Sequence, residues 1–89
     1  MKRIPIEDFF DLHSFLPRDV PDVLSDYLEE AQERGWLEVR IIHGKGKGVR
    51  RAEVRRLLAA NSRVAEVFDA PPERGGSGAT IVVLRTQLP

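Results

Sequence analysis

Residues 37–48 of this 89-residue chain read LEVRIIHGKGKG, and this stretch decides the fold. From Leu37 to His43 the sequence alternates between apolar and polar residues and then becomes fully apolar, which is typical of a strand inside a sheet. Five residues of alternating glycine and lysine follow, and a helical pattern begins at Val49. A strand that passes through a glycine-rich turn into a helix indicates an α/β architecture.

The segments on either side of this stretch predict two helices. The downstream helix is expected from about Val49 to Ala60. Upstream, the apolar residues recur at helical spacing and predict a helix from near Asp19 to Gly35. Asp19 is placed to cap this helix, with Asp22 three residues further on.

Three further segments predict strands at residues 8–12, 64–68 and 79–85, and the last of these is the most apolar. The element order is therefore βαβαββ. Strand–helix–strand connections make the flanking strands parallel, and the short loop at 71–78 makes the last strand antiparallel to the others. We expect a single domain over residues 1–89, with its core at about 8–86. Its fold class is α/β, an α+β two-layer sandwich in which both helices pack on one face of a four-stranded mixed sheet.

Composition excludes several classes of protein. A hydrophobic content of 42% with no net charge excludes intrinsic disorder, and the absence of cysteine excludes disulfides and thiolate metal sites. No apolar run approaches the roughly 18 residues of a membrane span, and the first residues lack the apolar stretch of a signal peptide. We therefore expect a cytoplasmic monomer with no membrane partner.

The charges are divided unevenly along the chain. Residues 1–38 hold four Lys and Arg against ten Asp and Glu, whereas residues 39–89 hold ten against four. A neutral protein with this division can attract polyanions with one surface and repel them with another. Two solvated helix faces of opposite sign would give the same pattern.

The glycine run is a candidate phosphate site. Glycines allow successive backbone amides to turn toward an anion, and the run opens into a helix amino terminus. It matches neither the ATP-binding phosphate loop nor the dinucleotide-binding fingerprint. A tight strand-to-helix turn is the structural alternative. The expected nucleic-acid or phosphate-binding residues in and after the run are Gly44, Lys45, Gly46, Lys47, Gly48, Arg50 and Arg51, and a second glycine-rich turn adds Gly76, Ser77 and Gly78.

Three titratable residues are expected near this run. Asp11 and His13 end the first strand and His43 ends the second, so the topology places all three at the carboxyl edge of the sheet, where α/β proteins bind ligands. A carboxylate beside an imidazole orients a general base or forms part of a metal site, here for Mg²⁺ or Mn²⁺. The structural alternatives are a half-buried His43 and an Asp11–His13 hydrogen bond that orders a loop.

Phe15 follows this first polar motif and has two interpretations. Exposed beside the site, it would offer a stacking surface for a base. The alternative is a loop residue that fixes the turn to the core, where Phe10 and Tyr27 are also expected.

Three motifs together resemble those of the Smr (small MutS-related) domain family, in the same order and context. They are residues 11–13 (Asp-Leu-His), 43–46 (His-Gly-Lys-Gly) and 75–80 (Gly-Gly-Ser-Gly-Ala-Thr), and the resemblance covers about residues 9–85. It implies a βαβαββ sandwich, similar to the carboxyl-terminal domain of a bacterial translation initiation factor. It also implies nicking or endonuclease activity, with Asp11, His13, His43, Gly44 and Gly46 carried over and Lys45 as a phosphate contact. Ser14 stands where the family usually has glycine.

The leading hypothesis is an endonuclease that holds a DNA or RNA phosphodiester in the glycine run and uses Asp11, His13 and His43 as base, acid or ligands of a divalent cation. The alternative is a non-catalytic module that binds RNA or the ribosome through the same cleft. A protein-interaction domain that uses the acidic first helix is a third possibility.

Overall fold

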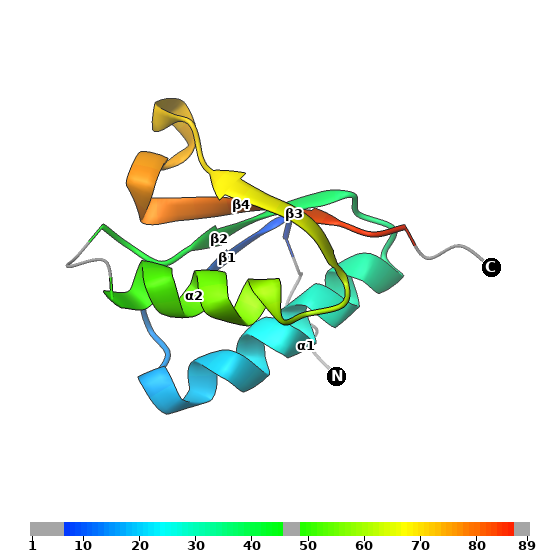
Figure 1. The fold of residues 1–89 in the computed structure, drawn as a ribbon, viewed down its shortest axis with the longest axis horizontal. Coiled ribbons are helices and arrows are strands. Elements are labelled where there is room, and N and C mark those ends of the chain that lie inside the picture. The colour runs from blue at the N-terminus through cyan, green and yellow to red at the C-terminus, as the bar shows by residue number, and fades with distance from the viewer. Residues whose placement is uncertain (1–6, 46–48, 87–89) are drawn as a thin grey trace.

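In the computed structural model, which describes residues 7–45 and 49–86, the most apolar strand of the sequence lies inside a four-stranded sheet (Figure 1). The strands are β1 (Phe9–Asp11), β2 (Glu38–Ile42), β3 (Val64–Asp69) and β4 (Ala79–Leu84), and their order across the sheet is β1-β2-β4-β3. β1 pairs with β2 in parallel, and β4 runs antiparallel to both β2 and β3. The expected mixed sheet is therefore confirmed.

Two helices cover one face of this sheet, as predicted: α1 (Val20–Glu33) and α2 (Val49–Ala59). Gly35 ends α1 with a φ of 80°, which a residue with a side chain adopts only with strain. The prediction for Asp19 is wrong in its mechanism, because its side chain makes no cap hydrogen bond. Asp19 belongs to a 3₁₀ turn, so its backbone is already helical, whereas a capping side chain needs an extended backbone.

The core lies between the helices and the sheet. It is built from α1, α2, β2 and β4, with Leu28, Ile41, Leu58 and Val82 completely buried. Neither helix in the described ranges has the length and hydrophobicity that crossing a bilayer requires.

Aromatic rings fix the first strand to α1. The rings of Phe10 and Tyr27 stack with centroids 4.6 Å apart, and Phe15 lies 5.6 Å from Phe10. Phe15 is half-buried and packs against the core, so its structural interpretation is correct and an exposed stacking surface is not formed there.

Candidate functional site

Four strand ends meet at one edge of the sheet. Asp11 is in register with Ile42, Ile42 with Ala79, and Thr80 with Asp69. The carboxyl ends of β1, β2 and β3 therefore lie beside the amino end of β4. We call this the carboxyl edge, and it consists of residues 11–13, 43–45, 69 and 76–80.

Backbone hydrogen bonds hold the three sequence motifs together at the carboxyl edge. The Leu12 amide donates to the Ile42 carbonyl at 2.9 Å, which joins the ends of β1 and β2. The amides of His43 and Gly44 both donate to the Gly78 carbonyl, at 3.0 and 2.9 Å. A Cβ on Gly78 would lie 3.0 Å from Cγ of Lys45, so glycine permits the close approach of these two turns.

Asp11 and His13 form an exposed dyad. Oδ1 of Asp11 accepts a hydrogen bond from the backbone amide of His13 at 2.9 Å and lies 2.9 Å from Nδ1 of the same residue. The pKa of the Asp11 carboxyl is lowered, first by that amide and also by the imidazole, against the opposing effect of partial burial. The imidazole is 77% exposed. Since Nδ1 contacts the carboxylate, Nε2 is the ring nitrogen of this exposed side chain that can accept a proton.

The serine that follows this dyad fits its turn. The described chain contains no residue other than glycine with a positive φ, so Ser14 adopts an ordinary backbone conformation. The Phe15 amide closes the turn by donating to the Leu12 carbonyl at 3.1 Å. Glycine is therefore not required at residue 14 for the backbone to present His13.

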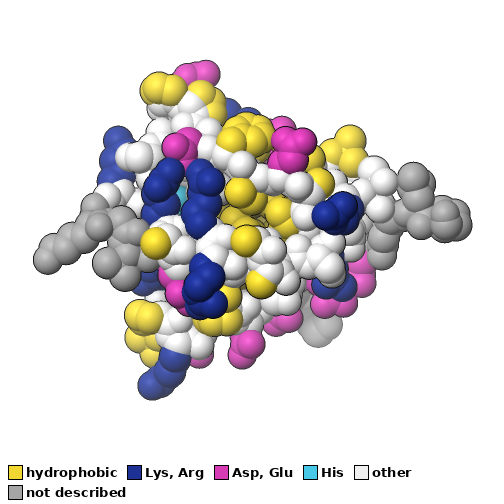
Figure 2. Space-filling model, viewed as in Figure 1, with side chains coloured by type: hydrophobic (Ala, Val, Ile, Leu, Met, Phe, Trp, Pro, Cys, Tyr) yellow, Lys and Arg dark blue, Asp and Glu magenta, His cyan; other side chains and the backbone are white. Residues whose placement is uncertain are grey.

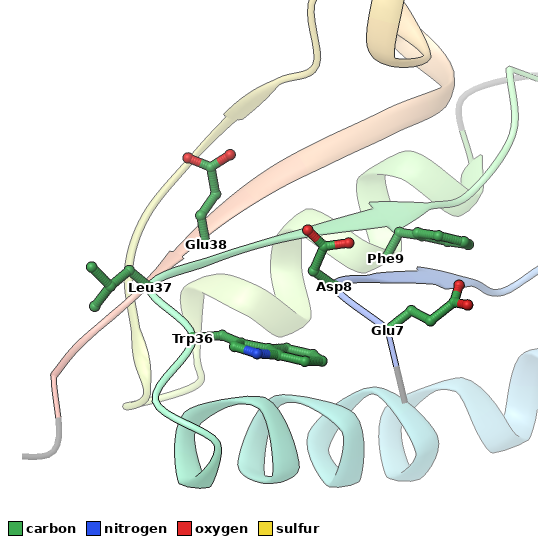
Figure 3. A pocket seen from close by; sticks show the side chains of 6 residues that line it. All are labelled: Glu7, Asp8, Phe9, Trp36, Leu37 and Glu38. Atoms are coloured by element: carbon green, nitrogen blue, oxygen red, sulfur yellow. The ribbon is translucent and has the colours of Figure 1, made fainter. Parts of the chain in front are cut away.

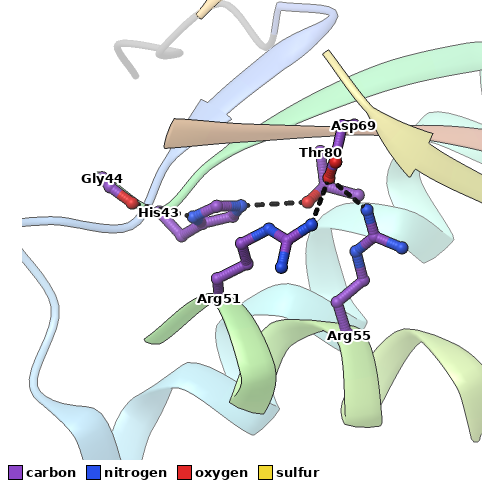
Figure 4. A network of polar contacts seen from close by, with 6 residues as sticks. All are labelled: His43, Gly44, Arg51, Arg55, Asp69 and Thr80. Atoms are coloured by element: carbon purple, nitrogen blue, oxygen red, sulfur yellow. Dashed lines mark hydrogen bonds and ion pairs between the residues drawn. The ribbon is translucent and has the colours of Figure 1, made fainter. Parts of the chain in front are cut away.

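His43 is buried, and both of its ring nitrogens have partners (Figure 4). Nδ1 lies 3.0 Å from the Gly44 carbonyl, and Nε2 lies 2.9 Å from Oγ1 of Thr80. The consistent neutral tautomer donates from Nδ1 and accepts the Thr80 hydroxyl at Nε2. His43 thus fixes the carbonyl of Gly44 at the start of the glycine run.

Burial makes the stability of the protein depend on His43 at mildly acid pH. Burial lowers the pKa of His43, and Arg51 and Arg55 add to this effect, against the opposing effects of the hydrogen bond to the Gly44 carbonyl and of the Asp69 charge. The unfolded chain therefore takes up a proton at about pH 6.5, before the folded protein does. The contribution of His43 to the free energy of unfolding is complete above pH 6.5. It is lost as the pH falls toward the pKa of His43 in the folded protein. We expect the free energy of unfolding, measured with urea, to decrease between pH 7.5 and 5.

The variant His43→Gln should show a smaller decrease over the same range. His13→Gln is the matched control, because it removes the only other histidine from an exposed position. If His43→Gln and the wild type show the same pH dependence, burial of a neutral His43 is not its cause.

The residues at this edge do not fit a metal site with three protein ligands. His43 turns into the sheet toward Thr80, whereas Asp11 and His13 contact each other at the surface. Among residues 7–45 and 49–86, no group of three or more His, Cys, Asp or Glu side chains is placed to hold a metal ion. The expected ligand set of Asp11, His13 and His43 is thus not brought together.

Several expected phosphate-binding groups have internal partners instead. The amides of Gly44, Gly76 and Gly78 donate to the carbonyls of Gly78, Pro71 and Gly75. Gly46, Lys47 and Gly48 lie outside the described residues.

The remaining expected phosphate-binding residues are divided between exposed and paired side chains. Lys45 and Ser77 are exposed. Arg50 donates from a terminal guanidinium nitrogen to the Leu12 carbonyl at 3.1 Å, which fastens the first turn of α2 to the end of β1. Arg51 pairs with Asp69.

The predicted site residues did not include Arg55 of α2, nor Asp69 and Thr80 at the carboxyl edge. Arg51 and Arg55, one turn apart on α2, both donate to Oδ1 of Asp69 at the end of β3. The spacing of the two arginines was a usable signal, and so was the single polar residue Thr80 within an apolar strand. Figure 2 shows Lys and Arg side chains gathered over the amino-terminal half of α2, with carboxylates among them.

The opposite edge of the sheet holds an acidic cavity. A cavity of ≈ 540 Å³ lies there, lined by Glu7, Asp8, Phe9, Trp36, Leu37 and Glu38 (Figure 3). Its three carboxylates would repel a polyanion. Lys45 and the pair Arg51 and Arg55 therefore lie at the other end of the strands from this acidic cavity.

A comparison with known protein families matches most of the chain. The family model described as Smr domain matches residues 10–85. The chain is 47% identical over 58 residues to endonuclease MutS2 of Thermus thermophilus and 36% identical over 83 residues to endonuclease MutS2 of Aquifex aeolicus. These matches cover 65% and 90% of this chain but only 8% and 11% of the two MutS2 proteins.

Two solved structures share the fold. The Smr domain of Thermus thermophilus MutS2 superposes with a TM-score of 0.81 at 38% identity, covering 86% of this chain and 96% of that one. YdaL of Escherichia coli, a stand-alone small MutS-related protein, superposes with a TM-score of 0.84 at 30% identity, covering 92% of this chain and 67% of that one.

Proposed function

The chain belongs to the Smr domain family, and on that basis we propose that it binds the phosphodiester backbone of a nucleic acid and cleaves RNA. The MutS2 relatives are endonucleases by name, and the matching part of each is its Smr region. The observation that carries the proposal is the exposed Asp11–His13 dyad beside the turn of Gly44 and Lys45.

The dyad has the arrangement of a general base. Asp11 holds Nδ1 of His13 in its protonated form, which leaves Nε2 to accept a proton from a bound substrate. RNA carries its own nucleophile, the 2′-hydroxyl, next to the phosphorus atom that it attacks. A positioned base therefore suffices to start the cleavage of RNA. To cleave DNA, which lacks the 2′-hydroxyl, an enzyme must first position and activate a water molecule.

Cleavage of RNA by this base takes place in a single displacement at phosphorus. His13 Nε2 takes the 2′-hydroxyl proton, the 2′-oxygen bonds to the adjacent phosphorus, and the bond from phosphorus to the 5′-oxygen breaks. The leaving oxygen receives a proton from water, and the hydroxide that this leaves takes the proton from Nε2 of His13, which restores the base. The products are a 2′,3′-cyclic phosphate and a 5′-hydroxyl. The Lys45 ammonium and the amino terminus of α2 would stabilise the negative charge that develops on the phosphate.

Backbone binding follows from the charge distribution. Lys45 is exposed at the carboxyl edge, α2 begins beside it, and the acidic cavity lies at the other end of the strands. Binding through phosphates is independent of sequence and sensitive to salt. The cleavage step needs no divalent cation.

The test is cleavage of an end-labelled RNA and nicking of a supercoiled plasmid by the wild-type protein, each with EDTA, Mg²⁺ or Mn²⁺. We expect RNA cleavage that persists in EDTA and leaves cyclic phosphate ends. Binding without cleavage of either substrate would contradict catalysis and favour the non-catalytic RNA- or ribosome-binding module. Cleavage only with a metal ion would contradict the metal-free mechanism.

A further inference from the structure

The guanidinium groups of Arg51 and Arg55 converge on a single carboxylate oxygen at the end of β3. Both donate from a terminal nitrogen to Oδ1 of Asp69, and the three side chains are 37%, 30% and 53% exposed (Figure 4). Two positive charges share one negative charge, so the cluster keeps a net charge of +1. The Nε atoms of Arg51 and Arg55 are buried without a hydrogen-bond partner among the described residues.

We propose that Arg51 and Arg55 form a second backbone-phosphate site, and that Asp69 occupies it in the free protein as an internal substitute for phosphate. This inference rests on the proposed binding of nucleic acid. Two adjacent guanidinium groups are the donor set that phosphate oxygens prefer, because each group offers several N–H donors in a fixed plane. The carboxylate of Asp69 demonstrates that the space between them accepts an anionic oxygen.

The position of this site determines the length of ligand that it fits. Across the sheet order β1-β2-β4-β3, the Asp11–His13 dyad lies at one end of the carboxyl edge and Asp69 at the other. Three strand spacings separate the two ends, a distance of roughly 14 Å. A single phosphate group cannot reach both ends, so the ligand is a polynucleotide that lies along the edge.

Asp69 stays ionised under ordinary conditions. The hydrogen bond from Arg51 is the largest cause that lowers the pKa of the Asp69 carboxyl, and the charges of Arg51 and Arg55 add to it. A phosphate therefore has to displace or share this carboxylate, and a weakly charged ligand cannot do so. The cluster thus selects for the high charge density of a polynucleotide backbone.

The test compares Asp69→Asn with Glu53→Gln in binding to a labelled single-stranded RNA over a series of salt concentrations. Each variant removes one negative charge that pairs with an arginine of α2, since Glu53 pairs with Arg56. We expect Asp69→Asn to bind about fivefold more tightly, the effect of removing one competing charge at contact distance in water. For this variant, the slope of the logarithm of the binding constant against the logarithm of the salt concentration should become steeper by about 0.7–0.9. Glu53→Gln should change the affinity by less than about twofold.

A double variant, Asp69→Asn with Arg55→Gln, should lose the tighter binding. If Asp69→Asn does not fold, Arg55→Gln and its control Arg56→Gln carry the same test: Arg55→Gln should weaken binding and flatten the salt slope, and Arg56→Gln should not. Equal effects of Asp69→Asn and Glu53→Gln, or equal effects of Arg55→Gln and Arg56→Gln, would overturn the second site alone. If neither the wild type nor Asp69→Asn binds RNA at low salt, the proposed function and the second site both fail.

Discussion

Replacement of Asp11 by asparagine is expected to lower the rate of RNA cleavage by about 10²-fold or more, the usual contribution of a positioned acid–base group. Asparagine keeps the size of the side chain but lacks the carboxylate that holds Nδ1 of His13 in its protonated form. Binding should be unchanged or slightly tighter, because the substitution removes a negative charge from the carboxyl edge. Single-turnover cleavage and equilibrium binding of the same labelled RNA measure the two effects separately.

Asp26→Asn is the matched control for this prediction. It makes the same chemical change at an exposed position on α1, away from the carboxyl edge. Its cleavage rate should equal that of the wild type. Equal cleavage by the wild type and Asp11→Asn would assign the activity to another site or to a contaminant.

Joint replacement of Lys45 and Lys47 by alanine should weaken nucleic-acid binding by about 10²-fold at 0.05 M salt. Each lost phosphate contact lowers the slope of log K against log salt by about 0.7–0.9, so two contacts lower it by roughly 1.4–1.8. The loss should be similar for unrelated sequences, because phosphates carry no sequence information. Fluorescence anisotropy with two unrelated RNAs over a salt series measures both the slope and the affinity.

Arg34→Ala combined with Arg85→Ala removes two positive charges from exposed positions at the opposite edge of the sheet. This control should leave the slope nearly unchanged. A loss of affinity for only one of the two RNAs in the lysine variant would indicate base readout and would contradict binding through the backbone.

The fold was predictable because local patterns and tertiary packing agree. β4 is almost entirely apolar and is buried on both faces, whereas β2 alternates, with Val39 and Ile41 buried and Glu38 exposed, and the apolar stripe of α1 fits a single face of the sheet. Asp19 is the exception, since the choice between a cap and a 3₁₀ turn depends on its backbone angles. Residue type alone does not determine those angles.

The candidate site was predictable in position and less so in orientation. The topology correctly places His43 at the same edge as Asp11, but alternation along β2 directs it to the side of the buried residues Val39 and Ile41. Applying that alternation one residue beyond the strand would have favoured a buried histidine. Arg51 and Arg55 are 18 and 14 positions from Asp69 in the sequence, so their pairing with Asp69 depends on how α2 packs against β3.

The strand order has a consequence for the making of this protein. β4 joins β2 to β3, yet it is the last of the four strands along the chain. During translation, both helices and the other three strands are therefore synthesised before the strand that unites the sheet. Until Ala79–Leu84 emerges, β2 and β3 each present an unpaired edge, and the apolar faces of both helices lack part of the surface that they cover. The nascent domain is thus a substrate for chaperones or for aggregation until late in its synthesis, and it acquires its structure in one final step.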